Sequence, residues 1–114
     1  MLISKSEMRK EERPEMRGGV GTTEIYHALE ADPSHHFRLV GEVRLPAGAS
    51  IGMHQHSGER EYFFFCSGSG VVDDDGVEKP VHPGDIMITG DGASHGVRNT
   101  GKDDLLFFAI IVTD

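Results

Sequence analysis

From residue 22 onward, the chain is divided into short runs of apolar and β-branched residues, separated by turns rich in glycine, aspartate and proline. No segment carries apolar residues at the three- and four-residue spacing of an amphipathic helix. Many short strands with glycine-rich turns indicate an all-β sandwich or barrel, and fifteen glycines among 114 residues fit that class. A chain of this length forms one domain with its own core.

The strongest strand signal is the alternation of apolar and polar residues over 37–45. Asp75-Gly76 between two strand-like runs predicts a hairpin turn. The charged residues 1–19 lack a regular pattern and end in Gly18-Gly19, so we expect an N-terminal arm followed by one domain over 20–114. The expected strands are 23–29, 37–45, 62–66, 71–72, 86–88 and 105–112.

The last expected strand, 105–112, is apolar on both faces. Only one of these faces can point into the core of the domain, because strand side chains alternate between the two faces. A monomer rarely exposes a large apolar patch, so a second subunit is the simplest cover and predicts a homodimer. The N-terminal arm or a neighbouring sheet of the same chain is the alternative cover.

The charge and the cysteine content restrict the function. A net charge of −8 argues against nucleic acid as a partner, since phosphate binding requires a basic surface. The single cysteine, Cys66, excludes an intrachain disulfide framework and is expected to be a buried thiol within an apolar run. No secretory signal and no membrane-spanning apolar segment are visible, so a cytoplasmic location is expected.

The candidate metal ligands are His54, His56, Glu61 and His95. Residues two apart on a strand share a face, so His54 and His56 can bind one ion together. Glu61 is a carboxylate five residues further on, and His95 follows a glycine-rich loop. Imidazole and carboxylate ligands together indicate a divalent transition metal. Ordinary strand histidines, facing solvent or a polar interior, are the alternative.

Two spaced motifs connect these residues with a known family. The first is Gly48-x5-His54-x-His56-x4-Glu61-x6-Gly68, and the second is Gly84-x5-Gly90-x-Gly92-x2-His95-x3-Asn99. They resemble the two motifs of small, single-domain bacterial cupins, except that Gly90 stands where the family usually has proline. The resemblance implies a cupin double-stranded β-helix, a jelly-roll barrel, preceded here by the short N-terminal arm. It also implies that His54, His56, Glu61 and His95 are the metal ligands.

The resemblance implies one divalent transition metal ion per chain (Mn, Fe, Ni or Zn) and a small-molecule ligand. We expect a metalloenzyme acting on a small carbonyl, carboxylate or sugar-derived compound, in an isomerase, lyase, decarboxylase or dioxygenase class that the sequence does not resolve. A non-catalytic cupin that binds or senses a small ligand is the alternative, and a barrel without metal is a third. The acidic lid residue that oxalate chemistry uses in this family is not evident in the short segments of this chain.

Further residues are predicted around the ligands. Phe63, Phe65 and Val97 share the strand parity of Glu61 and His95, so they are expected to line the pocket, although plain core packing explains the phenylalanines equally well. Ser94 and Asn99 are the nearby candidates for orienting the imidazoles. Arg38, on the polar side of its strand, is expected to face away from the site.

Overall fold

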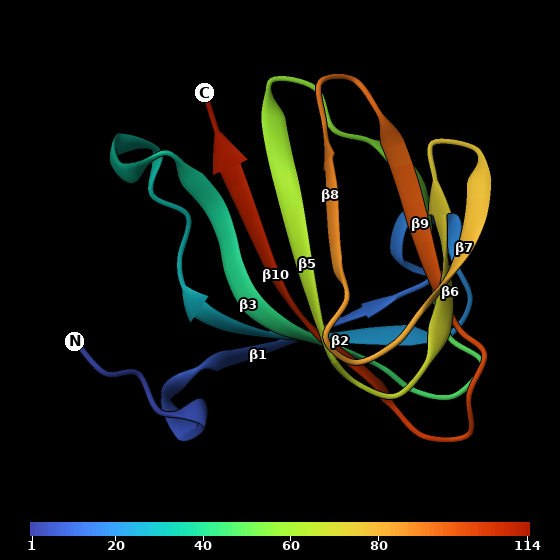
Figure 1. Cartoon of the computed structure of the whole chain (residues 1–114). Helices are drawn as coiled ribbons and strands as arrows, with labels where there is room; N and C mark the ends of the chain where they lie inside the picture. The colour runs from blue at the N-terminus through green and yellow to red at the C-terminus, as the bar shows by residue number, and fades with distance from the viewer.

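The computed structural model describes residues 1–114 and consists of strands joined by turns and three short 3-10 helices, with no α-helix (Figure 1). None of its helical segments has the length or hydrophobicity needed to cross a bilayer. The 3-10 helices are η1 (Lys5–Glu7), η2 (Met16–Gly18) and η3 (Pro33–His35). The strands are β1 (Arg9–Pro14), β2 (Thr22–Leu29), β3 (Phe37–Leu45), β4 (Ser50–Gln55), β5 (Glu59–Ser67), β6 (Gly70–Asp74), β7 (Val77–Val81), β8 (Ile86–Gly90), β9 (Ser94–Asn99) and β10 (Leu105–Thr113).

The strands form two antiparallel sheets. The six-stranded sheet has the order β1-β2-β3-β10-β5-β8, and the four-stranded sheet has the order β4-β9-β6-β7. Consecutive strands such as β4 and β5 lie in different sheets, so the chain crosses repeatedly between them. The two sheets diverge from one end of the molecule and enclose the core between them (Figure 1). The all-β barrel predicted from the strand pattern is confirmed.

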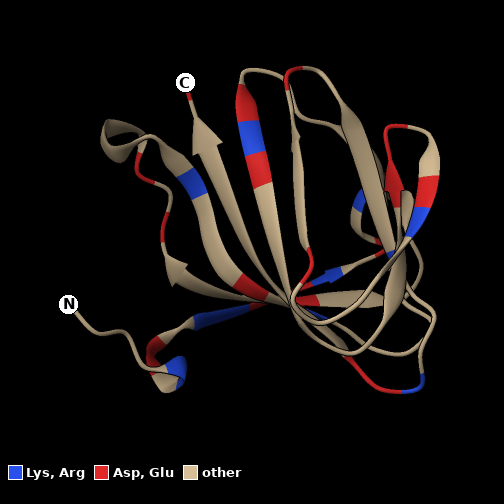
Figure 2. Ribbon diagram, in the orientation of Figure 1, with Lys and Arg blue, Asp and Glu red and all other residues tan.

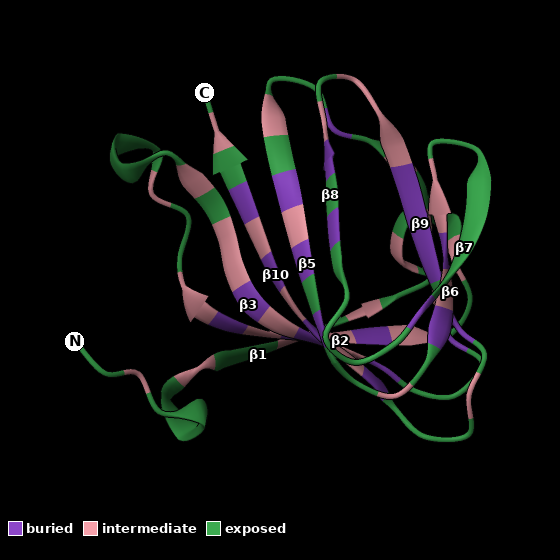
Figure 3. Ribbon diagram, in the orientation of Figure 1, coloured by how far each residue is buried: buried purple, intermediate pink, exposed green.

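The core is made by the inward faces of both sheets. On β10, Leu105, Phe107, Ala109 and Ile111 are buried, while the alternate residues are only partly buried or exposed. This alternation of buried and exposed bands is visible along β10 and β5 in Figure 3. The inward rows of the six-stranded sheet pack against buried residues of the other sheet, among them Ile51, Val72 and Val97.

The N-terminal arm is more ordered than its sequence indicated. Residues 9–14 form β1, which pairs antiparallel with β2 along its whole length, from Arg9 opposite His27 to Pro14 opposite Thr22. Its side chains are charged on both faces, so neither apolar alternation nor a turn signal distinguished it from a loop. The prediction of a patternless lead-in over 1–19 was wrong for this segment.

The prediction for Cys66 was also wrong, because its thiol is exposed. Phe63 and Phe65 on β5 are buried, whereas Phe64 and Cys66 point outward. Strand alternation therefore decides the position of the thiol.

Candidate metal centre

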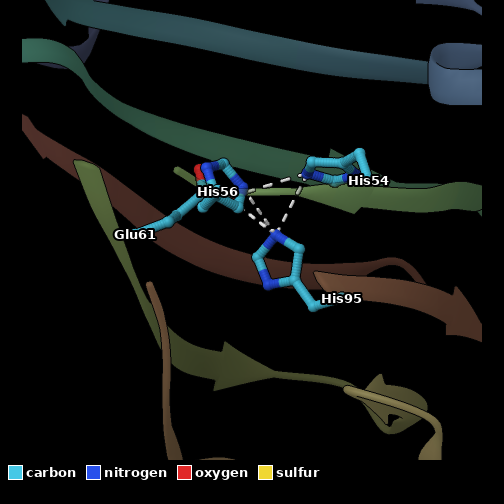
Figure 4. Close-up of side chains that lie close together, drawn as sticks. All are labelled: His54, His56, Glu61 and His95. Carbon is cyan, nitrogen blue, oxygen red and sulfur yellow. Dashed lines mark hydrogen bonds and ion pairs between the residues drawn. The ribbon is translucent and has the colours of Figure 1, made fainter. Parts of the chain in front are cut away.

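The four candidate ligands come together between the two sheets. His54 lies on β4, His56 directly follows that strand, Glu61 lies on β5, and His95 lies on β9. Figure 4 shows the three imidazole rings and the carboxylate converging on one point. The ligand atoms lie within 4.8 Å of one another, and all the side chains except the partly exposed His54 are buried.

The separations of these atoms show that they can share one ion. The Nε2 atom of His95 lies 3.1 Å from that of His54 and 3.0 Å from that of His56. Glu61 Oε1 lies 2.9 Å from His95 Nε2, but 4.0 Å from His54 Nε2. Ligands ~2.1 Å from an ion are ~3.0 Å apart as neighbours in an octahedron and ~4.2 Å apart as opposites, but ~3.4 Å apart throughout a tetrahedron. The contacts of His95 match neighbours in an octahedron, and the four donor atoms are close enough to share one ion.

Each imidazole is oriented by a contact to its other ring nitrogen. His54 Nδ1 lies 2.7 Å from the carbonyl oxygen of Gly52, and His95 Nδ1 lies 2.8 Å from the hydroxyl of Thr89. His56 Nδ1 lies 2.5 Å from Glu59 Oε2. A hydrogen on each Nδ1 atom can be donated to these oxygens, which leaves the Nε2 lone pairs directed at the common centre. Such contacts fix both the tautomer and the ring orientation of a metal-binding histidine.

The ionisation of the cluster follows from burial and from these contacts. Burial lowers the pKa of His54 to about 4, so this ring is neutral at pH 7. Burial also opposes the charged form of His56, but hydrogen bonds to Glu61 and Glu59 outweigh it and raise the pKa of this ring. Burial disfavours the Glu61 carboxylate as well, yet hydrogen bonds from His56 and His95 lower its pKa. Glu61 is thus an anion at neutral pH, as a metal ligand must be.

Glu59 connects the cluster to a second charged residue. The Arg38 guanidinium donates two hydrogen bonds to Glu59, of 2.6 and 2.7 Å, and lowers the pKa of that carboxyl to about 2. In Figure 2, a basic band on β3 lies near the same end of the sheet as the acidic bands at the start of β5. The chain Arg38–Glu59–His56 therefore keeps an ionised carboxylate, paired with a guanidinium, behind one imidazole.

A cavity of about 70 Å³, partly open to solvent, extends from the cluster toward the N-terminal segment. His54, His56 and Glu61 lie in its wall, and Phe63 stacks on the ring of His95 with the centroids 4.8 Å apart. Of the three residues predicted to line the pocket, Phe63 lines this cavity. Phe65 and Val97 are buried in the core and are not part of its wall.

The wall also contains basic residues that the sequence did not single out as a group: Arg13 on β1, Arg17 in η2, His27 on β2 and Arg38 on β3. The expectation that Arg38 faces away from the site was wrong. Ile111 pairs with Leu39 and Val112 with Phe37, so Arg38 is the extra residue of a β-bulge and departs from the strand alternation.

Neither of the residues expected to orient the imidazoles does so. The Asn99 side chain instead donates to the carbonyl oxygens of Leu45 and Asp103 and accepts from the Gly101 backbone, which fixes the turn before β10. The Ser94 backbone N–H donates to Asp75. Glu59 could have been predicted as a partner of the ligands, because it shares strand parity with Glu61 and lies three residues after His56.

The chain belongs to the cupin family. The family model described as a cupin domain matches residues 41–111, which include all four candidate ligands. The predicted membership of the family and the predicted double-stranded β-helix are thereby confirmed.

The chain resembles several proteins of known name or structure. The chain is 40% identical over 113 residues to a protein of Thermotoga maritima named oxalate-binding protein, covering 98% of this chain and 93% of that one. It also matches the crystal structure of a predicted oxalate decarboxylase from Thermotoga maritima, with a TM-score of 0.94, 39% identity and complete coverage of both chains. The polyketide cyclase RemF from Streptomyces resistomycificus has the same fold, with a TM-score of 0.75 and 16% identity over 99% of this chain and 78% of that one.

Proposed function

We propose that the protein holds one divalent transition metal ion (Mn, Fe, Ni or Zn) at His54, His56, Glu61 and His95, and that it binds a small carboxylate there. The observation that carries the proposal is the convergence of three imidazole nitrogens and one carboxylate oxygen, with His54, His56 and Glu61 in the wall of a cavity. Each imidazole has an oxygen partner on its far nitrogen, which a set of unrelated histidines would not require.

The ligand class is supported by charge and by the relatives. Four protein ligands on a six-coordinate ion leave two positions for a small molecule. Three arginines line the cavity, although the chain as a whole carries a net charge of −8. Oxalate is the first ligand to test, because a relative that is 40% identical carries the name oxalate-binding protein. A bound ion would polarise the carboxylate or acidify a bound water.

A metal-dependent enzyme is the second candidate function, favoured by His27 in the cavity wall. This imidazole is buried and is not part of the ligand cluster, and its Nε2 atom lies 2.7 Å from Glu11 Oε1. A histidine paired with a carboxylate can act as a general acid or base toward a ligand in the same cavity. We expect the reaction, if one occurs, to fall in the isomerase, lyase, decarboxylase or dioxygenase classes.

The proposal is tested by elemental analysis of protein purified without an affinity tag, followed by calorimetry with oxalate. We expect close to one metal ion per chain, its loss in His56→Ala and His95→Ala, and oxalate binding only to metal-loaded protein. Metal content unchanged in both variants would disprove the ligand assignment. Incubation of the loaded protein with oxalate and related acids then separates the two functions, since a binding protein returns the acid unchanged and an enzyme yields product.

We further propose that the protein is a homodimer through the outer face of the six-stranded sheet. Two cross-strand rows of apolar residues cover the part of this face that β10, β5 and β8 form. One row is Phe108–Phe64–Ile86, and the other is Ile110–Tyr62–Ile88. Ile86 and Ile88 are 59% and 55% exposed in the single chain. A continuous apolar surface of this kind is typical of an interface.

The dimer is tested by light scattering coupled to size exclusion. Ile88→Lys should convert a dimer into a monomer, whereas Val77→Lys, an exposed apolar residue on the other sheet, should leave it intact. A wild-type protein that is monomeric at high micromolar concentration would exclude this interface.

A further inference from the structure

Arg17 differs from every other arginine in the chain because its guanidinium forms no ion pair. The other six arginines each contact a carboxylate. The pairs are Arg9–Glu30, Arg13–Glu11, Arg38–Glu59, Arg44–Glu42, Arg60–Asp91 and Arg98–Glu78. Arg17 is exposed, so a ligand in the cavity can reach its donors. This residue also lines the cavity that contains the candidate metal ligands.

The neighbouring basic groups of the cavity are already neutralised. Arg38 donates two hydrogen bonds to Glu59. Arg13 donates to Glu11, and the same carboxylate contacts His27. Arg17 is therefore the one arginine of the cavity without a carboxylate partner, and a guanidinium can bind a carboxylate through two parallel hydrogen bonds.

The backbone holds Arg17 in an unfavourable conformation. Its φ of 55° and ψ of 31° lie in the left-handed region, which residues other than glycine, asparagine and aspartate seldom adopt. Glycine would occupy this position without strain. Glu15 in the same turn also has a positive φ, of 49°, so the strain belongs to the turn. What distinguishes Arg17 is that it makes no ion pair and borders the cavity.

The segment that carries Arg17 is fixed to the ligand-bearing strand. A Cβ atom on Gly52 of β4 would lie 2.0 Å from the Arg17 carbonyl oxygen, so the two backbones are in direct contact. The Gly52 carbonyl oxygen in turn lies 2.7 Å from His54 Nδ1. The next residues are secured by two hydrogen bonds, from Val20 N to Ser50 Oγ and from Ser50 N to Val20 O. The arginine and the ligand cluster therefore share one rigid support.

We propose that Arg17 binds the acidic group of the ligand that lies away from the metal, and that it thereby selects dicarboxylates over monocarboxylates. The inference rests on the proposed function, since one carboxylate must be held by the ion for a second to face Arg17. It names a specificity residue outside residues 41–111, the segment that matches the family model. The ion and the arginine would hold the two ends of one dianion.

Oxalate and oxamate are the ligand pair for the test. They have nearly the same shape, but oxamate carries a neutral amide in place of one carboxylate. Calorimetry of Mn-loaded wild type should show oxalate binding at least tenfold more tightly than oxamate. In Arg17→Gln, the affinity for oxalate should fall about 10- to 100-fold, the range for losing a charge-assisted contact, while that for oxamate changes less than threefold. Arg17→Lys keeps the charge and should retain part of the preference.

Arg9→Gln is the matched control, because Arg9 lies on the same N-terminal segment, pairs with Glu30 and is not part of the cavity wall. The metal content and melting temperature of all variants are measured alongside. An unchanged oxalate-to-oxamate ratio in Arg17→Gln, or an equal loss in Arg9→Gln, would overturn the inference and leave the proposed function standing. Metal-loaded wild type that binds neither acid would overturn both.

Discussion

Replacing Thr89 by valine tests whether the contacts behind the imidazoles control metal binding. Thr89 lies on β8 with 1% of its surface exposed, and its hydroxyl oxygen lies 2.8 Å from His95 Nδ1. Valine has almost the same shape and lacks the hydroxyl, so the change removes one hydrogen-bond partner and little else. The ring of His95 remains packed on Phe63.

The size of the effect follows from what His95 must do in each state. Without metal, the His95 ring can change its tautomer or its hydrogen-bond partner. The free energy of unfolding of Thr89→Val should therefore fall by no more than about 1–2 kcal/mol. With metal bound through Nε2, the hydrogen stays on Nδ1, and a buried donor is left without an acceptor. Removing such a partner lowers metal affinity ~10- to 100-fold, equivalent to about 1.4–2.7 kcal/mol. The affinity is measured by chelator competition with Mn²⁺ and Zn²⁺.

Thr23→Val is the matched control. Thr23 on β2 is fully buried, and its hydroxyl oxygen has no hydrogen-bond partner. Removing this hydroxyl should leave metal affinity unchanged and raise the free energy of unfolding by about 1 kcal/mol, because an unsatisfied buried polar atom is lost. A Thr89→Val protein that keeps wild-type affinity within twofold, or a Thr23→Val protein that loses as much, would refute the orienting role of Thr89.

Three further predictions concern stability. Burial depresses the pKa of His54 to about 4, so the unfolded chain takes up a proton between pH 6.5 and 4 that the folded chain does not. In urea titrations, the free energy of unfolding of the metal-free wild type should therefore fall by about 2 kcal/mol more than that of His54→Gln between pH 7 and pH 5. Gly52→Ala should displace the segment around Arg17, lower the stability by about 2–3 kcal/mol and weaken oxalate binding, since its Cβ would meet backbone atoms. Asn99→Ala should cost about 3 kcal/mol in thermal or urea unfolding, because three hydrogen bonds are lost, and should leave metal affinity within twofold of wild type.

The candidate ligands could be predicted from sequence because their positions depend on local spacing. His54 and His56 lie two apart at the end of one strand, and the family motif supplies Glu61 and His95 at fixed distances along the chain. The groups that orient the imidazoles depend on which strands become neighbours. Thr89 faces His95 across the barrel, and Gly52 acts through its backbone, so neither leaves a residue-type signal in the sequence.

Departures from regular strand geometry account for another part of what the sequence did not reveal. Arg38 was placed on the outer face by alternation, but a bulge beside Ile111 turns it toward the cavity. Cys66 shows the opposite case: its parity with Phe64 predicted exposure, and the apolar character of its neighbours was given too much weight. Both outcomes depend on the register between strands, which composition does not determine.

The cavity is built from two parts of the chain with different chemical tasks. All four candidate ligands lie within residues 41–111, the segment that matches the family. The basic wall opposite them is supplied by Arg13, Arg17, His27 and Arg38, which all precede that segment. We therefore propose that the barrel strands hold the ion and that the strands and turns before residue 41 determine which anion fits against it. Changes to this N-terminal part should alter ligand preference and leave metal content intact, and changes to the four ligands should abolish both.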